Sequence, residues 1–161
     1  NSILASMNSI GIVERNYTSS RLQLRVNNMN ISLDRLDEAH KALLTETKTL
    51  IETLTQTLSL YVQDPASHSL QALPDYLKEL SGAALFLGNS AQQTALLTAA
   101  NFAQNRLNQN LALDAEQVNC ILNVVAGLDL LVDNLKNKQP VLQSMFDVAL
   151  SSSQQLQNIA A

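Results

Sequence analysis

The sequence predicts an all-α protein, folded as an up-and-down bundle of four to five main helices. Apolar residues recur at intervals of three and four positions through most of the chain, which is the period of a helix with one buried face. Only four glycines and three prolines interrupt the 161 residues. No segment alternates apolar and polar residues for long enough to predict a strand. With 46% hydrophobic residues, the chain has enough apolar surface to bury a core in one domain.

Residues 1–31 are expected to form an additional N-terminal helical segment that packs on the bundle or on a neighbour. Arg15, Arg21 and Arg25 make this segment locally basic. Such a set of charges is more often a solvated helix face than a docking strip. The bundle itself is therefore placed at residues 32–161.

The first long helix is predicted from about Ser32 to Val62. It should end at Asp64-Pro65, because the residue before a proline is pushed out of the helical region. The residues expected on its buried stripe, which include a histidine, are Leu36, His40, Leu43, Thr47, Leu50, Leu54, Leu58 and Tyr61.

Two shorter helices should follow. Pro74 suits the first turn of the second helix, where its missing N–H costs nothing. Gly88-Asn89 should stop that helix, and Ser90 is expected to cap a third helix that runs to about Asn108.

Asp114 should cap a fourth helix, with Gln117 as its capping-box partner three residues later. Pro140 is expected to open a fifth helix. The side chains predicted to point inward from that last helix are Leu142, Met145, Phe146, Ala149 and Leu156.

Charge and composition argue against two classes of partner. The net charge is −4 and there is no basic stripe and no Trp, whereas nucleic-acid binding needs clustered Lys and Arg. No apolar run approaches the roughly 20 residues that cross a bilayer, so membrane insertion is not expected. The single cysteine, Cys120, lies in an apolar run and should be a buried small hydrophobe. Its isolation fits a reducing, cytoplasmic compartment, and a periplasmic bundle that is poor in cysteine stays open.

Patterns that carry chemistry are mostly missing from the sequence. There is no Gly-rich phosphate loop, no CxxC and no HExxH, so we expect no enzyme activity, no cofactor and no metal site. His40 should be packed or partly buried, and His68 should be solvated in a turn. Asp129 and Asp133 stand one turn apart, for which the ordinary interpretation is a solvated helix face.

Gly82 is the residue that points most clearly to function. It stands inside an otherwise good helix, where glycine costs about 1 kcal/mol relative to alanine. Close helix packing would explain it, and so would a bare surface that a partner protein approaches. The surrounding residues Lys78-Glu79-Leu80-Ser81-Gly82-Ala83-Ala84 resemble the motif of histidine-phosphotransfer (HPt) domains, His-x-Leu-Lys-Gly-[Ser/Ala]-Ala. Gly88 falls at a later glycine of that motif.

Lys78 occupies the position of the phosphoacceptor histidine. A neutral imidazole can attack an aspartyl phosphate, whereas an exposed lysine is protonated near pH 7 and has no free lone pair. Together with the order of the helices and Pro140, residues 33 to 150 resemble the histidine-free HPt-like regions of pilus-chemotaxis proteins of the FimL and ChpA/PilL type. The resemblance implies a helical module that has lost phosphotransfer and kept its docking architecture.

That resemblance implies a non-catalytic, cytoplasmic scaffold in two-component signalling for type IV pili and twitching motility. Its partners would be a response regulator, a kinase domain or a polar scaffold protein, and its oligomeric state is open. The candidate docking residues are Lys78, Glu79, Ser81 and Gly82. An alternative is an extracytoplasmic four-helix sensor domain of a chemoreceptor-like protein. A third reading, a secretion or filament component, would polymerise in a concentration-dependent way.

Overall fold

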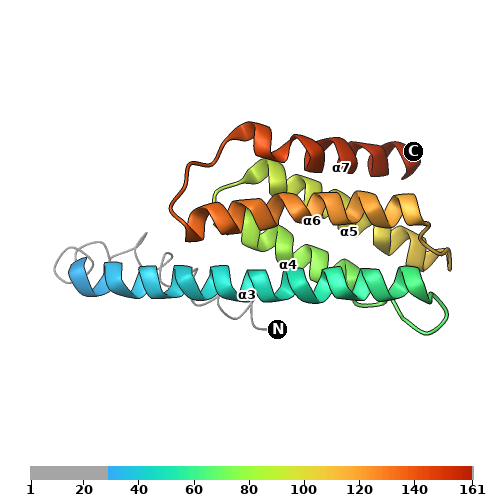
Figure 1. Ribbon diagram of the computed structural model, residues 1–161, viewed down its shortest axis with the longest axis horizontal. Coiled ribbons are helices and arrows are strands. Elements are labelled where there is room, and N and C mark those ends of the chain that lie inside the picture. Colours follow the sequence, from blue (N-terminus) through green and yellow to red (C-terminus); the bar gives the residue numbers. More distant parts are fainter. Residues whose placement is uncertain (1–28, 161) are drawn as a thin grey trace.

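The computed structural model describes residues 29–160, with side chains from residue 37 to residue 159, and every element of regular secondary structure in this part of the chain is a helix. Successive long helices run in opposite directions (Figure 1), which confirms the predicted all-α, up-and-down bundle. The expected N-terminal helical segment lies outside the described residues, except that residues 29–31 belong to the first described helix. The helices are α3 (Met29–Gln63), α4 (Leu73–Phe86), α5 (Ser90–Asn108), α6 (Ala115–Lys136), the 3-10 helix η2 (Gln143–Phe146) and α7 (Asp147–Ala160).

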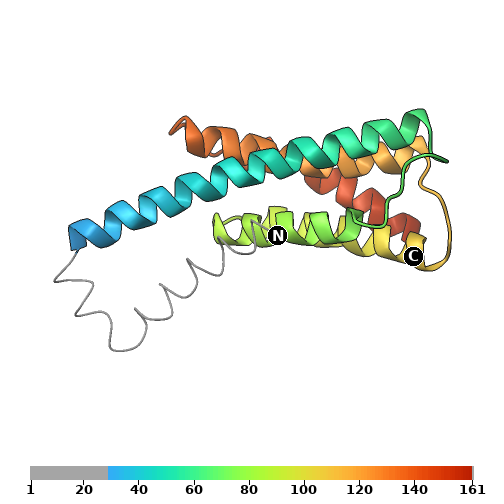
Figure 2. The same ribbon diagram turned by 90° about the horizontal axis from the view of Figure 1, so that it is seen from below.

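One hydrophobic core joins the five α-helices of the described region. The most extensive contact is between α4 and α5, α7 packs on both α5 and α6, and α3 packs on α4 and α6. Helix α3 crosses the others obliquely and extends beyond them at its amino end (Figure 2). The largest side chains that are almost completely buried are Phe146, Leu43, Leu54, Leu58, Leu73, Leu77, Leu80, Leu96, Ile121, Leu128 and Leu156.

Helix α3 follows the predicted stripe. Thr47 is fully buried on that stripe, and its hydroxyl donates to the Leu43 carbonyl oxygen at 2.6 Å, so burial leaves no unpaired hydroxyl. His40 is partly buried, as expected. The helix ends at Gln63, next to Asp64-Pro65, in agreement with the restriction that proline places on the residue before it.

The predicted position of the junction between α4 and α5 is confirmed, but the residue that caps α5 differs from the prediction. Pro74 lies in the first turn of α4, and Gly88 has φ of 83°, the left-handed conformation that glycine adopts without a Cβ clash. The cap of α5 is Asn89, not Ser90 as predicted. Asn89 is outside the helical region (φ −117°, ψ 89°), and its side chain accepts a hydrogen bond from the Gln92 N–H at 2.9 Å.

Asp114 caps α6 as predicted. Its carboxylate accepts from the Gln117 N–H at 2.8 Å, and the Gln117 side chain accepts from the Asp114 N–H at 3.0 Å. The expectation that no apolar run is long enough to cross a bilayer is wrong for α6, which alone among the described helices meets the criteria of length and composition. Half of that stretch is buried within the bundle, and core helices meet the same criteria of length and composition.

The prediction that Pro140 opens the last helix is wrong. The chain continues past Pro140 without regular structure, Leu142 is extended, and α7 begins only at Asp147, after the short helix η2. The Asn134 side-chain amide donates to the Pro140 carbonyl oxygen at 2.7 Å, which ties this loop to the end of α6. Leu142 is 59% exposed instead of pointing inward, whereas Phe146 is buried as predicted.

Helix α6 packs closely against α5 and α7 at Gly127, in the middle of α6. A Cβ on this residue would lie 2.5 Å from Gln92 Oε1 of α5 and 2.8 Å from the Ala149 Cβ of α7. Gln92 is fully buried, and its amide donates to the Val124 carbonyl oxygen at 2.6 Å. Its Oε1 has no hydrogen-bond partner among the described atoms and faces the Cα–H of Gly127, a weak donor.

Candidate functional site

The surface of α4 around Lys78 is the candidate docking site that the sequence predicts. Lys78 is exposed and Gly82 is partly buried. They are four positions apart on one helix, so they share a face. The Ser81 hydroxyl donates to the Lys78 carbonyl oxygen at 2.6 Å. This hydrogen bond stays within the helix and involves the backbone of Lys78, not its side chain.

Two of the four predicted docking residues are not on the surface. Glu79 is 8% exposed and Ser81 is 4% exposed, so the expectation that polar residues on both sides of Gly82 are exposed is wrong for these two. Burial raises the pKa of the Glu79 carboxyl, and the charge of Asp75 adds to this rise. The accessible part of the predicted site is therefore reduced to the face of Lys78 and Gly82.

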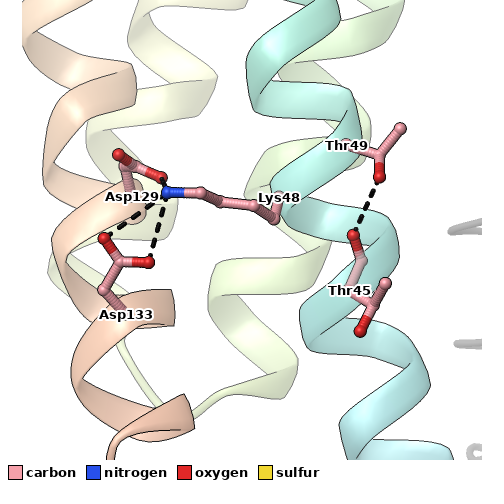
Figure 3. Close-up of polar contacts among 5 residues, drawn as sticks. All are labelled: Thr45, Lys48, Thr49, Asp129 and Asp133. Atoms are coloured by element: carbon pink, nitrogen blue, oxygen red, sulfur yellow. Dashed lines mark hydrogen bonds and ion pairs between the residues drawn. The ribbon is translucent and has the colours of Figure 1, made fainter.

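A second polar cluster joins α3 to α6 (Figure 3). The Lys48 ammonium group lies 2.6 Å from Asp129 Oδ1 and 3.2 Å from Asp133 Oδ1. The hydrogen bond to Asp129 is the main cause that raises the pKa of Lys48; burial opposes the rise and Asp133 adds to it. The two aspartates are partly exposed, at 35% and 44%, but the interpretation of them as a solvated helix face missed their lysine partner. The i, i+4 spacing of the aspartates was the visible signal, but their lysine partner is 81 positions away from Asp129.

The remaining candidates for chemistry are metal ligands, the cysteine and the second histidine. The described side chains contain no group of three or more His, Cys, Asp and Glu residues that could hold a metal ion. Cys120 is buried as predicted, and its thiol donates to Gln155 Oε1 at 3.1 Å. Burial, with smaller contributions from Glu116 and Asp114, raises the pKa of this thiol, which disfavours the reactive thiolate. His68 is partly buried, where a solvated side chain was expected.

Cavities in the described part of the chain include a small apolar one and a larger one lined by lysines. The small one, of about 90 Å³, lies beside Tyr61 and Arg106. The larger one, of about 450 Å³, lies between α3 and the end of α6 and is lined by His40 and three lysines. The sequence did not single out these lysines, because they come from segments far apart in the chain.

Comparison with known proteins gives one informative result. No curated protein and no solved structure is detectably similar to the chain. The family model for the FimL C-terminal domain, however, matches residues 34–153, which is most of the chain. That match spans every described helix, from the first turns of α3 into α7. The chain therefore belongs to the FimL family, as a representative of its C-terminal domain.

Proposed function

We propose that the chain is a non-catalytic, HPt-like interaction module that works as a cytoplasmic scaffold in the signalling that controls type IV pili and twitching motility. Membership of the FimL family indicates a role in pilus-related chemosensory signalling. The docking role is the finer part of the proposal, and its partners would be a response regulator, a kinase domain or a polar scaffold protein.

The observation that carries the proposal is the exposure of Lys78 beside Gly82. In the HPt-like alignment Lys78 stands where the phosphoacceptor would be, and it is accessible to a partner. Its ammonium form has no lone pair to accept a phosphoryl group. Gly82, one turn later, carries no side chain, so a partner's backbone or side chain can approach α4 closely there. A site of this kind supports recognition without transfer.

Binding of a purified receiver domain from a pilus response regulator, measured by calorimetry, tests this proposal. Gly82→Arg should abolish binding, because the arginine fills the approach to α4. Ala126→Arg is the matched control: it places the same side chain on an exposed position of α6 and should leave affinity unchanged. Circular dichroism would verify that both variants are folded.

Two results would contradict the proposal. One is unchanged affinity of a folded Gly82→Arg variant. The other is transfer of radiolabelled phosphate from the phosphorylated receiver to this chain, because the Lys78 surface is proposed to bind without accepting the phosphoryl group.

A further inference from the structure

The cavity between α3 and the end of α6 is lined by Lys41, Lys136 and Lys138, and we call it the lysine pocket. Its volume is about 450 Å³, which lies within the range of protein ligand sites. Leu44, which is buried, and Leu135, which is partly buried, supply an apolar floor. The pocket therefore combines cationic walls with a surface that suits an apolar side chain.

The charge of the pocket is opposite to that of the whole chain. Three lysines face a single acidic side chain, that of Asp37, although the chain carries a net charge of −4. All three lysines are exposed, and none forms an ion pair with another described residue. Lys48, by contrast, is held by two aspartates. The lysine pocket is thus a local excess of positive charge on the described surface, with three ammonium groups and one carboxylate in its lining.

The backbone at Lys138 shows that a lysine is not the residue that local structure favours there. Two positions after the last residue of α4, α5 and α6 stands a residue of positive φ, namely Gly88 at 83°, Asn110 at 55° and Lys138 at 54°. In each case the next N–H bonds back into the helix, as Gln139 does to the Asn134 carbonyl oxygen at 2.8 Å. Glycine and asparagine are the usual residues at this position, and a lysine is strained by its Cβ. Lys138 is therefore the one of these three residues that is neither glycine nor asparagine, and it is the one that lines the pocket.

We propose that the lysine pocket binds an acidic peptide segment of a partner protein. Carboxylates of the segment would pair with Lys41, Lys136 and Lys138, and an apolar side chain between them would rest on Leu44 and Leu135. Sites for small molecules enclose most of their ligand. Here the three lysines are exposed around an open mouth, which suits a segment that passes across it. The inference rests on the proposed role as a docking module, but it concerns a different surface from that of Lys78 and Gly82.

Fluorescence anisotropy with the full chain tests the pocket directly. The probe is a labelled hexapeptide of aspartate and glutamate around one leucine, and its control has asparagine and glutamine in place of the acids. The acidic peptide should bind and the amide peptide should not. Lys41→Gln and Lys136→Gln should each weaken binding about two- to fivefold, as expected for exposed charge pairs. Added salt should weaken it further.

The strained lysine provides the sharpest variant. Lys138→Gly should raise the melting temperature, because it relieves the backbone strain, and should weaken peptide binding at the same time. Asn110→Gly is the matched control at the corresponding end of α5, and it should leave binding unchanged. A simple loss of folding would lower both stability and binding, so the opposite signs separate the two explanations.

Three results would overturn the inference. They are unchanged peptide affinity in the Lys138→Gly variant, equal binding of the amide peptide, and inorganic phosphate competing at the same lysines as tightly as the peptide binds. A failed pocket proposal would not affect the proposal for the Lys78 surface, because the two surfaces are tested with different ligands. Gly82→Arg is expected to leave hexapeptide binding unchanged. The failure of either proposal is therefore visible without the other.

Discussion

At residue 127, α6 passes Gln92 of α5 and Ala149 of α7 at contact distance, and the space that a methyl group would need is already filled. Ala149 Cβ is fixed to its backbone, and Gln92 is held by its hydrogen bond to the Val124 carbonyl oxygen. Gly127→Ala should therefore overpack the core, at a cost of about 1–3 kcal/mol. The gain in helix propensity, about 1 kcal/mol, offsets part of this. Urea unfolding should show a net loss of stability.

The double variant Gly127→Ala/Ala149→Gly is the control for this prediction. Removing the Ala149 methyl group relieves one of the two close contacts of the new methyl group, although the contact with Gln92 Oε1 stays, so the two changes together should cost less than the sum of their separate effects. A Gly127→Ala variant that is more stable than the unaltered protein would show that the bundle has room at this position.

Glu79 should make stability depend on pH. Its pKa is raised above the usual 4.5, so the folded state holds this proton more tightly than the unfolded chain does. Ionised Glu79 therefore destabilises the folded state at any pH above its folded pKa. This destabilisation disappears as the pH falls through 4.5, where the unfolded chain also becomes protonated. Glu79→Gln should raise the melting temperature at pH 7, and the difference from the unaltered protein should close in acid.

Glu52→Gln, on the exposed face of α3, is the matched control for that measurement. It removes the same charge without removing a buried carboxyl, and its melting temperature should follow that of the unaltered protein across the pH range. A Glu79→Gln variant that is less stable than the unaltered protein at neutral pH would mean that the carboxylate has a compensating interaction.

At the scale of elements, α3 is joined to α6 by the Lys48 ion pairs. The three side chains are 29%, 35% and 44% exposed, so solvent screens the interaction. Lys48→Met should lower stability by about 0.5–1 kcal/mol, partly because it leaves Asp129 and Asp133 to repel one another. Since the pKa of Lys48 is raised above 10.5, this contribution should be fully present below pH 10.5 and be lost as the pH rises through the folded pKa.

Salt provides the check on Lys48. Urea unfolding at low and high ionic strength should show a smaller difference between Lys48→Met and the unaltered protein at high salt. The combination with Asp129→Asn and Asp133→Asn should recover part of the loss. A difference that does not change with salt would show that the methylene chain of Lys48 contributes by packing and not by charge.

The helix ends show which part of the fold can be predicted from sequence. Asp114 and Gln117 form their capping box as predicted, and Asp64-Pro65 ends α3, because both signals act within a few residues of chain. Pro140 misled the prediction because proline fits an extended segment as well as a first helical turn. The loop at Pro140 is held by the side chain of Asn134, a contact that local sequence does not specify.

The candidate site was predictable only in part, for a similar reason. The helical position of Lys78 and Gly82 follows from the local pattern, but the burial of Glu79 and Ser81 depends on what packs over α4. The same signal that drew attention to Gly82, a glycine inside a helix, was also present at Gly127. The lysine pocket, assembled from α3 and the end of α6, has no signal in any single stretch of sequence.

At the scale of the whole molecule, the up-and-down order determines how the chain can reach its fold. The most extensive helix contact joins α4 and α5, which are separated by only three residues, whereas the larger contact of α3 is with α6, which lies far along the chain. Contacts between neighbours in sequence cost little loop-closure entropy, so they should form first. We expect the α4–α5 hairpin to be the folding nucleus. In stopped-flow experiments, Leu80→Ala should mainly slow refolding, whereas Leu54→Ala in α3 should mainly speed unfolding.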